Sequence, residues 1–201
     1  MYKSHADIRH CELASQLLYQ ASPKAYEYHF QTGSKTAIEF IQYEFQRGGG
    51  ICGHRNVRCL IENDQIIGTY LFYNTREFNT ISLQTVRNVL AFYPTFEVVR
   101  VLFRLLRLGS IMKSPRKGEV YLSNFSVALA FQGKGFGSTL LCDAREDFRK
   151  DKFEVMGLDV EVENVKAKAL YNRLGFVDRE RKTLSIGQTD TLGVIKMELR
   201  L

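Results

Sequence analysis

The most informative stretch of this chain for its fold is Phe125-Ser126-Val127-Ala128-Leu129-Ala130-Phe131-Gln132-Gly133-Lys134-Gly135-Phe136-Gly137-Ser138. A strand-like run leads into a short glycine-containing loop, and a helical pattern of apolar residues then begins at Phe136. Glycines let a ligand approach the backbone closely, and the first N–H groups of a helix lack partners within it. No Asp or Glu lies between Gln132 and Cys142, although helix starts usually favour acidic residues. The stretch therefore predicts an anion site that suits phosphate.

Two other phosphate-binding motifs are excluded at this loop. A Walker A loop needs four residues between its first glycine and a Gly-Lys-Ser/Thr, which the chain lacks here. The dinucleotide pattern G-x-G-x-x-G would need glycine at Ser138 or Leu140 and fails at both. On this loop alone, an ordinary tight turn remains as good an interpretation as phosphate binding.

A second informative segment covers residues 161–176 and reads Glu-Val-Glu-Asn-Val-Lys-Ala-Lys-Ala-Leu-Tyr-Asn-Arg-Leu-Gly-Phe. Asn164 lies 32 residues after Gln132, which is enough for one crossover helix and a return strand. Two strands joined in this way lie parallel, so we expect Asn164 near the same strand ends as the glycine loop. Taken singly, Asn164 is typical of a helix N-cap and Tyr171 of a packed aromatic.

The remaining pattern predicts a mixed α/β fold in one domain, residues 1–201. Pro23 ends the first predicted helix, an aromatic loop with Tyr26, Tyr28 and His29 follows, and Asn63-Asp64 forms the turn of a hairpin. Helices are expected over 7–20, 35–46, 83–112 in two blocks split near Pro94, 136–149 and 165–174. Strands are expected over 57–62, 66–72, 120–127, 155–162, 176–184 and 192–199.

The composition is that of a mildly basic folded protein. The 201 residues include 28 Lys plus Arg and 22 Asp plus Glu, and 45% of residues are hydrophobic, which excludes a disordered or collagen-like chain. The four cysteines show no C-x-x-C spacing, so we expect no zinc or redox motif and predict reduced, buried thiols in a cytoplasmic protein. We see no secretory signal at the start, and arginines interrupt the most apolar stretch, 98–112, so no membrane span is expected.

The two segments together resemble the GNAT superfamily of acyl-CoA N-acyltransferases. The phosphate loop of that family reads Arg/Gln-x-x-Gly-x-Gly/Ala, which Gln132, Gly135 and Gly137 match in full. Its later segment commonly reads Asn, two or three residues, Ala, then Leu-Tyr-x-Arg/Lys-Leu-Gly-Phe. The matching residues are Asn164, Ala167, Leu170, Tyr171, Arg173, Leu174, Gly175 and Phe176. The resemblance is clear over 120–176.

The resemblance implies a splayed, mixed and mostly antiparallel sheet flanked by helices, in which strands 120–127 and 155–162 part to admit acetyl-CoA. It implies that pantetheine pairs with the backbone of Phe125 and Val127 and that Asn164 contacts the pantetheine arm. Tyr171 would reach the sulfur and act as general acid, and the Val127 amide would stabilise the oxyanion. The cofactor-binding residues would also include Gln132, Gly133, Lys134, Gly135, Phe136, Gly137, Ser138 and Ala167, with no metal.

Several points stay open at this stage. The base is not identified: Glu119 and Glu161 are candidates, and each also reads as an ordinary solvated carboxylate. Only residues 1–3 could supply the first strand of the family, and the helical insertion 83–113 lies near the usual acceptor side. Tyr26, Tyr28 and His29 are candidates for the acceptor pocket, although an aromatic loop is more often packing.

The leading hypothesis is an N-acetyltransferase that acts on a small amine or an exposed protein amine. A CoA-binding regulatory module without turnover is the alternative. A third interpretation is a nucleic-acid or membrane-surface binder that uses Arg100, Arg104 and Arg107, but such a stripe is usually a solvated face, so we expect neither partner. The acceptor and the acyl chain length are not indicated, and a homodimer is compatible with the sequence although no residue demonstrates one.

Overall fold

The structure is a computed structural model that describes residues 2–63, 65–112, 114–187 and 189–201. Within them, one seven-stranded sheet has the order β1-β2-β3-β4-β5-β7-β6. Only the β4–β5 pair is parallel, and the other neighbouring pairs are antiparallel. The predicted mixed, mostly antiparallel sheet is therefore confirmed. The strands are β1 (Tyr2–His5), β2 (Arg58–Glu62), β3 (Gln65–Tyr73), β4 (Glu119–Val127), β5 (Val155–Glu161), β6 (Val177–Ser185) and β7 (Thr191–Arg200).

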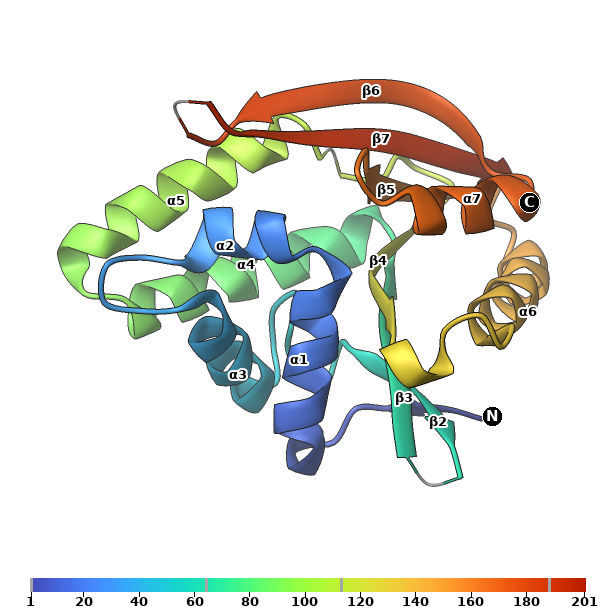
Figure 1. Cartoon of the computed structure of the whole chain (residues 1–201), viewed down its shortest axis with the longest axis horizontal. Coiled ribbons are helices and arrows are strands. Elements are labelled where there is room, and N and C mark those ends of the chain that lie inside the picture. Colours follow the sequence, from blue (N-terminus) through green and yellow to red (C-terminus); the bar gives the residue numbers. More distant parts are fainter. Residues whose placement is uncertain (1, 64, 113, 188) are drawn as a thin grey trace.

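Helices cover both faces of the sheet (Figure 1). The helices are α1 (Cys11–Ala21), α2 (Pro23–Phe30), α3 (Ala37–Arg47), α4 (Thr75–Phe92), α5 (Thr95–Gly109), α6 (Phe136–Lys150) and α7 (Val165–Arg173). Helices α1 to α5 share an aromatic and aliphatic core, whereas α6 and α7 pack a second core against β4, β5 and β7. Short 3₁₀ turns occupy Ile8–His10 and Leu129–Phe131.

The two central parallel strands separate along their length. Residues Glu119–Leu122 of β4 pair with Val155–Leu158 of β5, and the pairing ends there. In β4 an extra residue opposes β3 between Ser123 and Ser126, and Asn124 adopts a left-handed backbone with φ 52°. A bulge of this kind bends a strand, so the carboxyl half of β4 leaves β5 and a gap opens between them.

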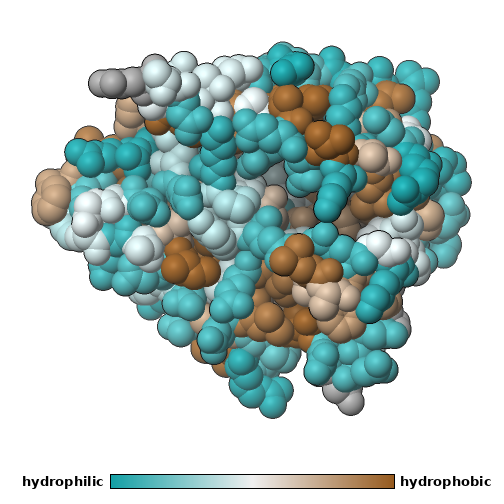
Figure 2. All heavy atoms as spheres, in the orientation of Figure 1, coloured by the Kyte–Doolittle hydropathy of each residue, from teal (hydrophilic) through white to brown (hydrophobic). Residues whose placement is uncertain are grey.

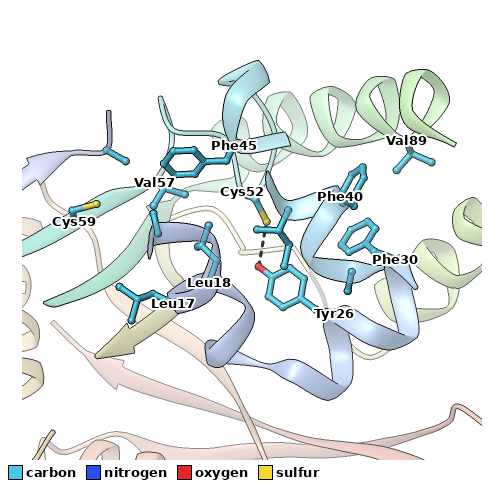
Figure 3. Close-up of a cluster of buried hydrophobic side chains, with 14 of the residues drawn as sticks. Leu17, Leu18, Tyr26, Phe30, Phe40, Phe45, Cys52, Val57, Cys59 and Val89 are labelled. Carbon is cyan, nitrogen blue, oxygen red and sulfur yellow. Dashed lines mark hydrogen bonds between the residues drawn. The ribbon is translucent and has the colours of Figure 1, made fainter. Parts of the chain in front are cut away.

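A buried polar network holds this bend against the helices. The Tyr26 hydroxyl donates to Asn124 Oδ1 at 2.8 Å, and Asn124 Nδ2 donates to the Ile51 carbonyl at 2.8 Å. The Cys52 sulfur lies 3.4 Å from the same hydroxyl, as the dashed line in Figure 3 shows, and the Cys52 N–H donates to the buried Glu44 carboxylate. Side chains of α2 and α3 therefore fix the geometry of β4.

The structure corrects several element boundaries. Pro23 does not lead into a loop but begins α2, where the missing N–H of proline is not needed. The helical block predicted over 83–112 begins earlier, at Thr75, because Asn74 and Glu77 form a capping box. The first strand is present and extends to His5. In the predicted turn at Asn63-Asp64, Asp64 lies outside the described residues, as does residue 113 of the predicted insertion.

The cysteines confirm part of their prediction. All four are free thiols within the described residues, and Cys52 and Cys59 are buried. Cys142 is exposed on α6 and Cys11 is only half-buried, so the expectation that every thiol is buried is wrong for these two residues.

Candidate active site

The glycine loop ends in a row of unpaired backbone amides. Within the described residues, the N–H groups from Gly133 to Ser138 have no hydrogen-bond partner, and the first bond of α6 runs from the Thr139 N–H to the Gly135 carbonyl. No side chain caps this helix, and its first turn holds no acidic residue. The loop is solvent-exposed. These are the properties of an anion site at a helix N-terminus.

Glycine is required at two points of this loop for conformational reasons. Gly133 and Gly135 have φ of 75° and 87°, a region that other residues rarely adopt. Gly137 is needed for a different reason, because a Cβ there would lie 3.1 Å from the Phe125 ring. The glycines thus shape the loop and let α6 approach β4 closely.

The loop is pinned to the end of β4 at one backbone carbonyl. The side-chain amides of Gln132 and Gln20 both donate to the Val127 carbonyl, at 2.8 and 3.1 Å. The next N–H, that of Ala128, bonds to Ile67 on β3. Since successive residues of a strand direct their backbone groups to opposite edges, the N–H groups of Phe125 and Val127 face the gap toward β5. Lys134 is exposed and stands 5.0 Å from the centre of the Phe131 ring.

The second predicted segment lies across the gap. Asn164 follows β5 and is the N-cap of α7, where its side chain accepts the Ala167 N–H at 3.1 Å. Tyr171 lies on the following turns of α7 and is buried, and burial raises the pKa of its hydroxyl well above the ordinary range. A tyrosine in this state keeps its proton at neutral pH.

A cavity of about 590 Å³ opens where β4 and β5 part. Tyr171, Asn164 and Ala167 border it from α7, and Phe125 from β4. Figure 2 shows a hollow near the centre of this face. In the same orientation, Figure 1 shows α2 to the left of this position and α7 to the right. The predicted residues Phe125, Asn164, Ala167 and Tyr171 therefore border one cavity, whereas Val127 and the predicted loop residues 132–138 are not among its lining residues.

Of the proposed acceptor-pocket residues, Tyr26 and His29 border the cavity, but Tyr28 does not. Tyr28 instead packs against Arg104, whose guanidinium carbon lies 5.6 Å from the ring centre. Burial and the nearby Arg104 lower the pKa of His29 to about 3, so this imidazole is neutral at physiological pH.

Two carboxylates border the cavity, Asp159 and Glu161, both on β5. Burial raises the pKa of Asp159 to about 6, and Tyr121 and Lys196 partly offset this effect. Glu161 accepts a hydrogen bond from the Ser22 hydroxyl. The sequence analysis did not predict Asp159 as a site residue, although an acidic residue within an apolar strand was a signal for it.

Glu119, the other candidate base, lies away from this cavity. It begins β4 where β4 and β5 are still paired, and its carboxylate is buried against Lys196 at 2.9 Å and the Arg116 N–H at 2.8 Å. Its role is therefore structural in this arrangement.

The arginines of α5 support tertiary structure. Arg104 donates to the Gln31 carbonyl at 2.7 Å, and Arg107 donates to the Ser185 carbonyl at 2.9 Å. Two of the three residues of the basic stripe thus tie α5 to α2 and to the β6–β7 hairpin.

In the described part of the chain, no helix combines the length and apolar character that crossing a membrane requires. The same residues contain no cluster of three potential metal ligands.

Comparison with solved structures shows the same fold at low sequence identity. An N-acetyltransferase from Staphylococcus aureus Mu50 matches with a TM-score of 0.71 and 13% identity over 99% of this chain and 100% of the other. A ribosomal-protein-alanine N-acetyltransferase from Brucella melitensis matches at 0.58 and 17% over the full length of both. The yncA structure from Salmonella typhimurium, which contains acetyl-CoA, matches at 0.56 and 17% over 100% and 93%.

No curated relative matches the sequence. A family model does: that of the acetyltransferase (GNAT) family matches residues 15–176, which include both predicted segments and most of the sheet. This chain therefore belongs to the GNAT acetyltransferase family.

Proposed function

We propose that the protein transfers an acetyl group from acetyl-CoA to a primary amine by direct attack within a ternary complex. One observation supports this proposal: β4 leads into the six unpaired amides of 133–138, and it parts from β5 at a cavity that Asn164 and the buried Tyr171 border. The amides suit a diphosphate, and the gap suits an extended arm that ends in a thioester.

The residues of the loop and of β4 bind and orient the donor. The N–H groups of Gly133, Lys134, Gly135, Phe136, Gly137 and Ser138 hold the diphosphate. The open backbone edge at Phe125 and Val127 aligns the pantetheine arm, with Asn164 and Ala167 facing it from the other side. Gln132 supports donor binding indirectly, because its hydrogen bond to the Val127 carbonyl holds the loop against β4.

Three groups serve the chemical step. The Val127 N–H faces the gap and is the donor for the oxyanion that develops as the amine nitrogen bonds to the thioester carbonyl carbon. Asp159 accepts a proton from the attacking nitrogen, since its pKa of about 6 leaves it ionised and moderately basic at neutral pH. As the carbon–sulfur bond breaks, Tyr171 gives its proton to the departing thiolate. The products are the amide and free CoA thiol.

Isothermal titration with acetyl-CoA, followed by detection of free CoA thiol with a panel of amines, tests the proposal. Binding with amine-dependent thiol release supports it. Binding without release from any amine would support the regulatory module instead. A Gly135→Ala protein, which perturbs only the loop, separates binding through these amides from binding elsewhere.

A further inference from the structure

The walls of the cavity differ in chemistry according to the element that supplies them. The β5 strand contributes the two carboxylates Asp159 and Glu161. Helices α4 and α5 contribute mainly aliphatic and aromatic side chains, with two hydroxyls at Ser82 and Thr85. The apolar lining from these two helices comprises Phe78, Ile81, Val86, Leu102, Leu105, Leu106 and Leu108.

The cavity also has an uneven charge balance. Among the described residues that line it, Asp159 and Glu161 carry the formal charges, and no Lys or Arg is present. His29 is neutral because of its burial. Neither carboxylate forms an ion pair within the described residues. Asp159 also lines a separate polar cavity of about 310 Å³ together with Lys182 and Lys196. These two lysines influence Asp159 from that side, and each is already paired with a glutamate.

These observations define what the cavity attracts and what it rejects. Unpaired carboxylates beside the thioester position attract an ammonium group. A carboxylate on the acceptor would meet two groups of the same charge, and no lysine or arginine among the described residues lines the cavity to balance it. A peptide backbone against the walls of α4 and α5 would leave amide groups without partners, which costs free energy.

We therefore infer, on the basis of the proposed function, that the acceptor is a small primary amine with an apolar body and no carboxylate. Its ammonium end lies at Asp159 and Glu161, and its apolar body lies against α4 and α5. An exposed protein amine is the less suitable acceptor for these walls.

A substrate panel tests this inference. Phenethylamine and phenylalanine share the same ring and amine but differ in the carboxylate, so we expect phenethylamine to have a roughly 100-fold higher kcat/KM. Spermidine, which lacks an apolar ring, and an Ala-terminated hexapeptide should each be poorer than phenethylamine. Equal or faster turnover of phenylalanine or of the peptide would overturn the inference while leaving acetyl transfer intact.

Binding measured without turnover keeps the inference separate from the proposed function. With CoA present, calorimetry should detect phenethylamine binding and much weaker phenylalanine binding. If phenethylamine binds but no amine releases thiol from acetyl-CoA, the acceptor class stands and acetyl transfer fails. If neither compound binds and thiol release occurs only with other amines, the acceptor class fails.

A lysine introduced inside the cavity can be compared with a lysine introduced outside it on the same helix. Val86 lines the cavity and is half-buried, whereas Leu83 is exposed on the same helix and does not line it. Val86→Lys should lower kcat/KM for phenethylamine about tenfold or more through repulsion of its ammonium group, and Leu83→Lys should change it less than about twofold. If Val86→Lys unfolds, Ser82→Lys provides the same test. Equal effects at 83 and 86 would contradict the assignment of the apolar wall.

Discussion

Replacing Asp159 with asparagine should make the protein more stable and less active at the same time. Asp159 is half-buried, and desolvation raises its pKa from the ordinary 3.8 to about 6. Each pKa unit corresponds to ~1.4 kcal/mol, so ionised Asp159 destabilises the folded state by up to ~3 kcal/mol. For a chain of this length, removal of that cost raises Tm by about 5–10 °C.

The sign of the pH dependence follows from the direction of the shift. Below pH 4 the carboxyl is protonated in both states, and asparagine brings little gain. As pH rises toward 6 the unfolded chain ionises first, so wild-type stability falls, and above pH 6 the loss is complete. The groups that face Asp159 are Tyr121 and Lys196, with Lys182 and Glu119 further contributing. The gain from Asp159→Asn should therefore appear between pH 4 and pH 6 and persist at pH 8.

The assays are thermal melts followed by circular dichroism across this pH range, together with thiol release from acetyl-CoA. Activity should fall about 10²- to 10⁴-fold, and the limb of the wild-type rate profile near pH 6 should disappear. Asp151→Asn, on the exposed end of α6, is the control and should change neither quantity. A variant that is no more stable than wild type at pH 8 would refute the burial argument, and unchanged activity would remove Asp159 as the base.

Three further outcomes are expected at the other site residues. Tyr171→Phe should lower kcat about 10²- to 10⁴-fold with little change in Tm; retention of full kcat at saturating acetyl-CoA would exclude the acid role. Gly135→Ala should cost ~1–2 kcal/mol in the conformation of the loop, because a positive φ of 87° disfavours alanine, and calorimetry should show weaker CoA binding. Gly33→Ala is the control, because Gly33 has no positive φ, lies outside both cavities, and an added Cβ would have only one neighbour, at 3.8 Å, among the described residues. Asn124→Ala should lower the free energy of unfolding by ~2–3 kcal/mol in urea melts, because alanine strains the bulge and the Tyr26 hydroxyl loses the amide oxygen that accepts its hydrogen bond. A loss below about 0.5 kcal/mol, the size of one weak hydrogen bond, would show that the network does not hold β4.

The local structure of the proposed donor site was predictable because it depends on neighbouring residues. The uncapped start of α6, the left-handed glycines and the N-cap at Asn164 depend on residues close together in the sequence. The parallel pairing of β4 and β5 followed from the length of the crossover between the two segments. Short-range spacing therefore predicted the glycine loop, the N-cap of α7 and the parallel strand pair between them.

The boundaries that were wrong had local signals with two meanings. Pro23 ends one helix, but proline is also favoured in the first turn of the next helix, and α2 begins there. The Asn74 and Glu77 capping box was visible in the sequence as a polar residue three positions before an acid, ahead of the strongest apolar spacing. Apolar periodicity alone placed the helix start too late.

The acceptor side could not be predicted because it is assembled from segments far apart in the sequence. The lining of the cavity comes from α2, α4, α5 and β5, and the value of each residue depends on what the fold places opposite it. Glu119 and Asp159 illustrate this, because both are acids on central strands. Glu119 is paired with Lys196, whereas Asp159 forms no ion pair within the described residues and lies between the larger cavity and a smaller polar one. A carboxylate becomes a base only where tertiary structure withholds its counter-ion. We expect the backbone amides of the loop to bind the donor by a rule that holds for any helix start, and the side chains of α4 and α5 to select the acceptor. Changes in acceptor preference should therefore come from substitutions in these helices rather than in the loop.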